Sequence, residues 1–445
     1  MPLQSFILTT VSRCFAQEAS STLIVEANTC PGTKDCKRIC KLYILYDSDR
    51  NPFRNLLAYT EEKSPLQKSI LALAARHFAN TGHSFNQIST DLHPRFDQGH
   101  LDALLFKKQA IEGLSSSLSR IDMHEKDSLT AAILLLIFLD ILESGIDGWK
   151  SHLRGVKSLV GLYWTLKSPV SSGTIHKDTG DTVQETRRFI ATQFSLYVSV
   201  FRESSWLVAN GNRIETLGAA MSSTESMPEH AFGDEIPRQQ ESILRSFLGC
   251  PGFLLKAIQF FSNQRESIAR LRTLDDISYN EHIRDTIAML QLTTDFDSYE
   301  WACDFQRPSG SSAIETEKAF LLSEAYKVAT LLYGKRVLGF IQATTPDTEV
   351  LVSQLLGMIN DLKRDMNFFK CLLWPTFIVG LNCREPNQQH LVIETLAMIW
   401  DLTSCLNVIS ASKILREHWQ RESQSDSPLQ ANSYIGGLGG DWLLI

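Results

Sequence analysis

The sequence predicts an all-α protein, and three observations support this. Apolar residues recur at helical spacing through most of the 445 residues, strand-like alternation is nearly absent, and 43% of the residues are hydrophobic, enough for a large core. The most apolar stretch is Leu129–Leu142, which is apolar on nearly every face. It spans only about fourteen residues and contains Asp140, whereas a bilayer span needs roughly 20. We therefore expect a buried central helix there.

This central stretch continues into a second helix that ends near Trp164. Gly145 and Gly148 break the chain between the two helices, and apolar residues from Trp149 onward recur at helical spacing. The two helices together predict a buried central helical hairpin. Three basic residues lie between the apolar positions of the second arm, and we interpret them as its solvated face rather than as a phosphate-binding stripe: Lys150, Arg154 and Lys157.

The chain before this hairpin predicts two more helices. Ser64-Pro65 is typical of a helix start, and Gly82 follows the predicted end. Residues 92–99, which contain proline and glycine, are expected to form a loop, and residues 101–118 to form a helix. The predicted buried face of that helix comprises Leu101, Leu104, Leu105, Ile111, Leu114 and Leu118.

After the hairpin, polar stretches at 167–182 and 219–237 predict loops between helical segments. Three long helical tracts follow, at 315–342, 348–379 and 388–422, and Trp374-Pro375 is expected to kink or restart the second. The predicted organisation is an irregular N-terminal arm (1–41), one large helical domain (42–422) and a polar, glycine-rich tail (423–445).

Charge and cysteine content restrict the class of protein. The net charge of −7 argues against a surface that binds nucleic acid as a whole. The nine cysteines are an odd number and form no secreted disulfide pattern, and the first residues do not resemble a signal peptide. We expect a reducing, intracellular compartment with free thiols that are mostly buried.

Metal sites are not predicted. Cys30, Cys36 and Cys40 lie among basic residues, but no CxxC pair occurs in the chain, so a tetrahedral zinc site lacks ligands at suitable spacing. His93 and His100 have no third ligand nearby, and Gly436–Gly440 has no preceding strand to build a phosphate-binding loop. The end of the tail, Asp441–Ile445, is expected to dock onto the body, with binding to a partner groove as the alternative.

An enzyme of the isoprenoid-lyase type is the alternative among large helical proteins, because its clustered carboxylates hold Mg²⁺ against a diphosphate. Asp275-Asp276 is the nearest aspartate pair, but Tyr279 stands where a third carboxylate is needed. A second motif begins at Asn360-Asp361, where Arg364 and Phe368 occupy the ligand positions. Both motifs fail, so the sequence favours no catalytic, cofactor-binding or metal-binding residue.

Five segments resemble the fungal-specific transcription factor domain. The resemblance extends from about Leu42 to near the C-terminus, and the segment 135–155 is its most specific part. The segments are NPFRNLL (51–57), SPLQKSILALAARHFA (64–79), LLIFLDILESGIDGWKSHLRG (135–155), AFLLSEAYKVATLLYGKRVL (319–338) and LLWPTFIVG (372–380).

The resemblance implies a helical regulatory domain of a nuclear protein that controls transcription, often of a pathway or a metabolite gene cluster. Relatives usually carry a six-cysteine zinc cluster upstream that reads DNA, and this chain has no recognisable cluster. It is therefore expected to reach DNA through other transcription proteins, or directly if a zinc cluster is missing from this chain. We further expect that the protein can bind a small-molecule effector and form a homodimer. We expect no membrane partner. A helical interaction scaffold and a helical enzyme are the alternatives.

Overall fold

The computed structural model describes residues 64–86, 94–118, 126–143, 249–270, 276–306 and 313–424, together with a few positions between 41 and 60. These residues form helices joined by turns, and no strand occurs among them, which confirms the all-α prediction. The chain divides into two compact units, Met1–Phe194 with Thr403–Asn407, and Ser195–Leu402 with Val408–Ile445. The second arm of the hairpin, the loops predicted at 167–182 and 219–237 and the tail lie outside the described residues.

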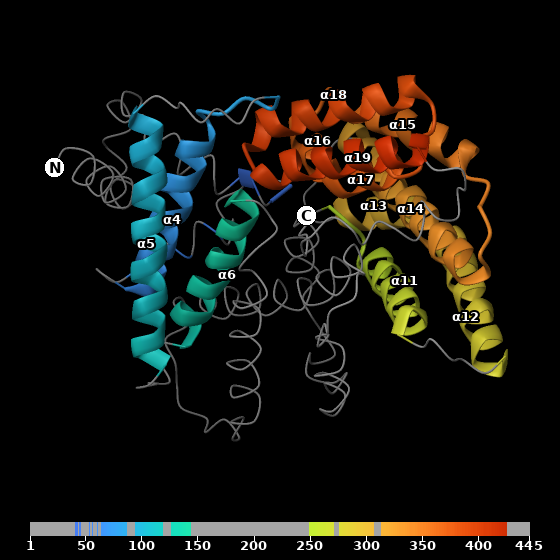
Figure 1. Ribbon diagram of the computed structural model, residues 1–445, viewed down its shortest axis with the longest axis horizontal. Helices are drawn as coiled ribbons and strands as arrows, with labels where there is room; N and C mark the ends of the chain where they lie inside the picture. Colours follow the sequence, from blue (N-terminus) through green and yellow to red (C-terminus); the bar gives the residue numbers. More distant parts are fainter. Residues whose placement is uncertain are drawn as a thin grey trace. The chain divides into compact units, whose positions relative to one another are not determined.

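The first unit contains α4 (Pro65–Asn80), α5 (Pro94–Leu118) and α6 (Lys126–Glu143), and α4 packs against both other helices (Figure 1). Every residue from 131 to 142 of α6 is buried. The ring of Phe53 meets that of Phe138 edge-on, with 5.5 Å between centroids. The predicted central helix is confirmed as a fully buried core helix.

The start of α4 follows its sequence signals. The Ser64 hydroxyl accepts a hydrogen bond of 3.2 Å from the Gln67 N–H, and Pro65 occupies the first helical position. The helix ends at Asn80, two residues before Gly82. Both predicted boundaries are confirmed.

The prediction for α5 was wrong in two respects. The helix begins at Pro94, so residues 94–99 are helical, because proline fits the first turn of a helix as well as a loop. Of the predicted apolar face, Leu114 is buried as expected, but Leu101, Leu104, Leu105 and Ile111 are exposed. The buried side of the helix instead includes Ala103, Phe106 and Ala110. Small residues face α4, and a Cβ at Gly113 would lie 3.1 Å from Pro65. Close approach of the two helices at these small residues contributes to the choice of buried face.

The second unit is built around α14 (Ala313–Gln342), a helix of 30 residues that other helices cover along its length (Figure 1). The helices that pack against it include α11 (Gly252–Arg270), α12 (Asp276–Asp295), α13 (Ser298–Gln306), α15 (Glu349–Leu362) and α17 (Leu373–Gly380). The hydroxyl groups of Tyr333 in α14 and Ser262 in α11 lie 2.8 Å apart, so each of these buried hydroxyls has a hydrogen-bond partner.

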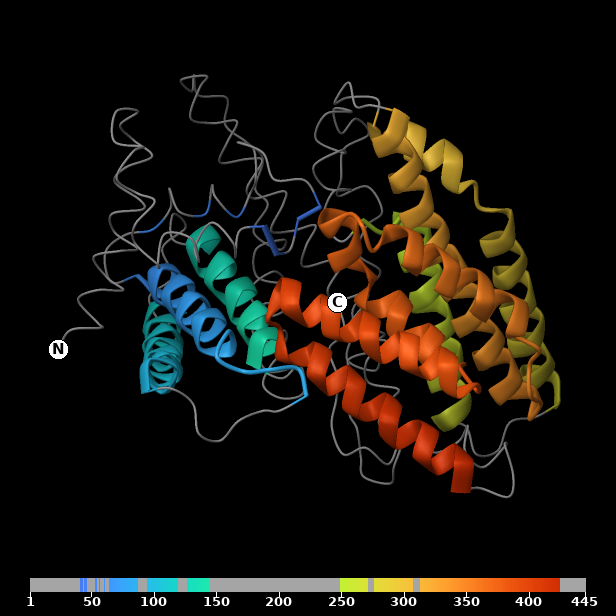
Figure 2. The same cartoon turned by 90° about the horizontal axis from the view of Figure 1, so that it is seen from above.

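The tract predicted at 348–379 is divided into α15, the short α16 (Met366–Phe369), a 3₁₀ turn at Lys370–Leu372 and α17. The predicted restart at Trp374-Pro375 is confirmed, because α17 begins at Leu373. The prediction of one long helical tract at 388–422 was wrong. This part of the chain forms a helical hairpin of α18 (Pro386–Thr403) and α19 (Leu406–Gln424) (Figure 2).

The break between α18 and α19 is a tight turn without glycine or proline. Ser404 adopts a φ of 50°, in the left-handed region that ends a helix, and the Cys405 N–H donates to the Thr403 hydroxyl at 3.4 Å. Because these residues carry no strong turn signal, the apolar periodicity predicted one continuous helix through the turn.

Five cysteines lie in the described part of the chain and all are free thiols: Cys250, Cys303, Cys371, Cys383 and Cys405. Burial raises the pKa of Cys371 to about 11 and that of Cys383 to about 12, so both stay protonated at neutral pH. In the described part of the chain, no helix combines the length and apolar character that crossing a bilayer requires.

Candidate functional sites

Segments that carry the family resemblance pair with each other inside each unit. In the first unit, α4 contains nearly all of the segment 64–79. It packs on α6, whose C-terminal half contains the first residues of the segment 135–155. In the second, α14 and α17 pack together, and the Tyr326 ring stacks on Trp374 with 6.0 Å between centroids. The Tyr326 hydroxyl also donates to the Cys371 carbonyl at 2.8 Å. The resembling segments therefore form the two cores.

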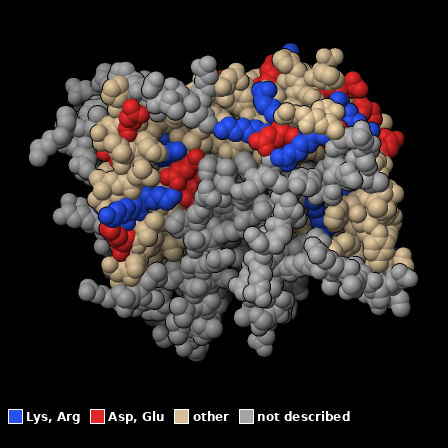
Figure 3. All heavy atoms as spheres, viewed as in Figure 1, with Lys and Arg blue, Asp and Glu red and all other residues tan. Residues whose placement is uncertain are grey.

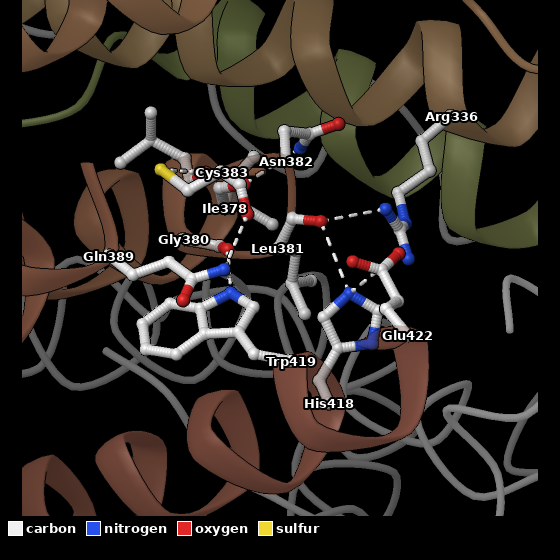
Figure 4. A network of polar contacts seen from close by, with 11 residues as sticks. Arg336, Ile378, Gly380, Leu381, Asn382, Cys383, Gln389, His418, Trp419 and Glu422 are labelled. Atoms are coloured by element: carbon white, nitrogen blue, oxygen red, sulfur yellow. Dashed lines mark hydrogen bonds and ion pairs between the residues drawn. The ribbon is translucent and has the colours of Figure 1, made fainter. Parts of the chain in front are cut away.

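The first candidate site lies at the C-terminal end of α17 (Figure 4). Trp419 Nε1 donates to the Gly380 carbonyl at 2.8 Å, and Arg336 Nη1 donates to the Leu381 carbonyl at 2.9 Å. His418 Nε2 lies 3.3 Å from the same Leu381 carbonyl. The last carbonyls of a helix have no partner within it, so side chains from α14 and α19 supply the missing donors. A cation at this end also complements the helix dipole.

Burial determines the charge state of this network. His418 is only 4% exposed, and burial together with Arg336 lowers its pKa to about 3. The imidazole is therefore neutral at pH 7, and its 3.4 Å contact with Glu422 is a polar contact rather than an ion pair. Burial lowers the pKa of Arg336 to about 10 and raises that of Glu422. We interpret this site as the joint that fixes α17 to α14 and α19.

The second candidate site is a group of polar residues within the helices of the first unit. Lys107 of α5 reaches α6, where its Nζ lies 2.8 Å from Asp140 and 2.6 Å from Glu143. Asp140 is fully buried, at 0% exposure. Burial alone would lower the pKa of Lys107, but the two carboxylates outweigh this effect and raise it. An ionised lysine thus neutralises Asp140, the one acid within the apolar stretch Leu129–Leu142 of α6.

The same site extends to the C-terminal half of α4. Asn80 is fully buried, and its Nδ2 donates to the carbonyls of Leu142 at 2.8 Å and Ser404 at 2.9 Å. One turn earlier, Arg76 Nη1 donates to Nδ1 of His100 on α5. Burial and the nearby Arg76 charge lower the pKa values of both His100 and His83, which follows α4. A cation, two neutral imidazoles and a buried amide therefore lie close together.

The residues weighed for metal or enzyme sites have other roles in the described structure. Phe368 is buried in the core, Arg364 is exposed, and the Tyr279 hydroxyl donates to the Ile341 carbonyl. His100 contacts Arg76 rather than a second histidine. Among the residues that the structure describes, no group of three or more potential ligands could hold a metal ion. Cys30, Cys36, Cys40, His93, Lys150, Arg154, Lys157, Asp275, Gly436–Gly440 and Asp441–Ile445 lie outside the described residues.

Sequence reasoning did not find Arg76, Asn80 or Lys107, because their partners are 24, 62 and 33 positions away. One signal did exist. An aspartate inside an otherwise apolar helix needs a cation or strong hydrogen-bond donors. Asp140 therefore indicated a buried polar contact, but not which residue makes it.

The visible surface of the described residues carries both signs of charge. Figure 3 shows Lys and Arg side chains next to Asp and Glu side chains, without a broad area of one sign on that face. A protein that binds the DNA backbone usually presents a continuous basic surface. The described residues on this face therefore present no continuous basic surface.

The described residues form an all-helical protein whose buried polar networks join segments distant in the sequence. Comparison with known families defines it further: the fungal specific transcription factor domain matches residues 36–444. The chain belongs to this family.

A curated relative, the acriflavine sensitivity control protein acr-2 of Neurospora crassa, is 22% identical over 395 residues. The aligned region covers 86% of this chain and 60% of the relative, so the chain spans about three fifths of that protein's length. No solved structure matches the chain.

Proposed function

We propose that this chain is a nuclear, non-enzymatic regulator that controls transcription through contacts of its helical body with other transcription proteins. The observation that carries the proposal is the family match over residues 36–444, almost the whole chain. The acidic net charge and the mixed surface charge favour recruitment to promoters through partners, or through a zinc cluster outside this chain, over direct DNA binding by these residues. Association of two copies is part of the proposal.

The proposed mechanism is a shift between two packings of the helices. A small effector or a partner that binds one packing more tightly increases its population. The polar site of the first unit supports this mechanism, because Asn80, Arg76 and Lys107 join segments that are distant in the sequence through hydrogen bonds and ion pairs. Such directional contacts distinguish two arrangements more sharply than apolar packing does.

The regulated genes are proposed to include a metabolite biosynthesis gene cluster. The relative from Neurospora crassa is named for the control of acriflavine sensitivity, so genes that determine drug sensitivity are a second candidate set. Transcript profiling of a deletion strain, with and without acriflavine, distinguishes the two. A change confined to contiguous biosynthetic genes supports the first set, and a change only under the dye supports the second.

The central experiment joins the whole chain to a heterologous DNA-binding domain and measures a reporter gene that carries its binding site. We expect reporter transcription to differ from that with the DNA-binding domain alone, in either direction. A fusion that accumulates in the nucleus without changing the reporter contradicts the proposal. The enzyme alternative is tested by incubating the purified chain with a prenyl diphosphate and Mg²⁺. Release of diphosphate at an enzymatic rate would favour that alternative.

A further inference from the structure

Arg76 is a buried cation with an unusual set of partners. Its side chain is only 9% exposed, and its Nη1 donates to an imidazole nitrogen of His100, which carries no negative charge. The Nε atom is buried and makes no hydrogen bond in the described structure. Buried guanidinium groups normally contact a carboxylate, because removing the charge from water is costly. Here, among the described residues, the cation forms no hydrogen bond to a carboxylate, and its Nε donor has no partner.

The acids near Arg76 do not fill this role. Glu143 acts on the Arg76 charge electrostatically and raises its pKa, but burial outweighs this effect and the pKa is lowered overall. Glu143 Oε2 is instead held by Lys107 at 2.6 Å. Asp97, which acts on the two neighbouring histidines, has an exposed side chain on α5. Glu143 therefore compensates the positive charge of Arg76 only in part.

His83 presents a second unsatisfied nitrogen in the same place. Its Nδ1 is buried and makes no hydrogen bond in the described structure, although the residue as a whole is half-buried. His83 lies three residues beyond Asn80, the last residue of α4, and its ring interacts electrostatically with both Arg76 and His100. Arg76 and His100, which share a hydrogen bond, and the nearby His83 thus leave two buried nitrogens open, and among the described residues no carboxylate is hydrogen-bonded to Arg76.

We propose that Arg76, His83 and His100 form a binding site for a small-molecule oxyanion, a carboxylate or a phosphate group. Such a group accepts a charge-assisted hydrogen bond from Arg76 Nε and one from an imidazole, so it satisfies both open nitrogens and neutralises the buried cation. The planar guanidinium matches the geometry of an oxyanion and not that of a halide ion. The inference rests on the proposed function, since it assigns the chemical class of the effector.

Occupancy of this site affects how the helices pack. Arg76 and Asn80 lie one turn apart on α4, and Asn80 holds the carbonyls of Leu142 and Ser404. An anion that fixes Arg76 stabilises this turn of α4, and with it the junction of α4 with the end of α6. The bound and free proteins consequently differ in the stability of this junction.

The test uses the purified full chain with sodium acetate, potassium phosphate and sodium chloride at matched ionic strength. Thermal unfolding reports binding. We expect a saturable rise in Tm with acetate or with phosphate and none with chloride, and the salt that gives the larger rise identifies the chemical source. No saturable rise with either oxyanion, or an equal rise with chloride, would overturn the proposal.

Variants locate the effect. Arg76→Met is expected to weaken oxyanion binding about tenfold or more, the usual effect of losing a hydrogen bond to a charged group. If this variant fails to fold, His83→Ala serves instead, because His83 is half-buried beyond the end of α4. Arg265→Met is the matched control, since Arg265 is equally buried but lies in the second unit. An unchanged rise in a folded Arg76 or His83 variant overturns the assignment.

This binding measurement does not involve transcription. A negative result therefore removes the oxyanion site and leaves the proposed regulator intact. An inactive reporter fusion removes the regulator, whether or not the anion binds.

Discussion

His418 illustrates how a single buried residue makes stability depend on pH. Its pKa is about 3 in the folded protein, because burial and Arg336 disfavour the charged form, against an ordinary value near 6.5 when unfolded. Between these values the unfolded chain binds a proton that the folded chain does not, so stability falls as the pH is lowered below about 6.5. The predicted loss from this residue is about 2 kcal/mol at pH 5.

Replacement of His418 by glutamine tests this prediction, because the amide N–H can still donate near the Leu381 carbonyl but does not titrate. Urea unfolding at pH 7 and pH 5 measures the free energy of unfolding of both proteins. We expect the wild type to lose about 2 kcal/mol more than the variant between the two pH values. Burial raises the pKa of Glu422, which acts in the opposite direction, but this contribution is common to both proteins. Equal losses in the two proteins would contradict the neutral, buried state of His418.

The sequence revealed residues whose environment is local. The Ser64 cap and the restart near Pro375 were predicted because each depends on neighbours a few positions away. Asn80 was not predictable in the same way, since one of its partners, the Ser404 carbonyl, is 324 positions away. Its amide resembles any polar residue near the end of a helix until the fold brings that carbonyl to it.

At the scale of whole helices, apolar periodicity predicted that α4, α5, α6 and α14 exist but not how each is oriented. The period identified α6 correctly because all its faces are buried. It failed for α5, where Ala103 and Ala110 face the core and Leu101 faces outward. Periodicity weights large side chains, whereas closely packed helices select small ones at the contact, so the orientation of α5 depended on the shape of α4.

Glycines in helices provide a prediction about such close contacts. A Cβ added at Gly334 of α14 would lie 2.6 Å from Cζ of Phe261 and 2.8 Å from Cδ2 of Leu290. We expect Gly334→Ala to destabilise the protein by about 1–3 kcal/mol, the usual cost of overpacking a core. The matched control is Gly357→Ala in α15, where the added Cβ meets no atom within 4 Å.

The control variant should stabilise the protein by about 0.5–1 kcal/mol, because alanine loses less backbone entropy than glycine in a helix. Urea unfolding of both variants against the wild type measures the two changes. Similar small changes of the same sign would show that Phe261 and Leu290 move aside without cost, which contradicts a tightly packed contact of α14 with α11 and α12.

At the scale of the whole molecule, charge predicts how the chain meets DNA. The sequence carries 50 acidic and 43 basic residues, and the described residues on the face shown in Figure 3 mix the two signs. Non-specific binding to DNA comes from the release of counterions by clustered lysines and arginines. We therefore expect the purified chain to bind a labelled duplex of random sequence with a Kd above about 1 µM at physiological salt.

Fluorescence anisotropy at 50 mM and 200 mM salt measures this binding and its salt dependence. Tight binding at low salt that weakens about a hundredfold or more at 200 mM would indicate several phosphate contacts and contradict the prediction. The basic stripe of the predicted second hairpin arm supplies the internal control, because Lys150, Arg154 and Lys157 are expected to be a solvated face. Replacement of all three by glutamine should leave the weak binding unchanged. A loss of affinity on this replacement would instead make the stripe a DNA contact, and the protein would then reach promoters partly by itself rather than only through partners.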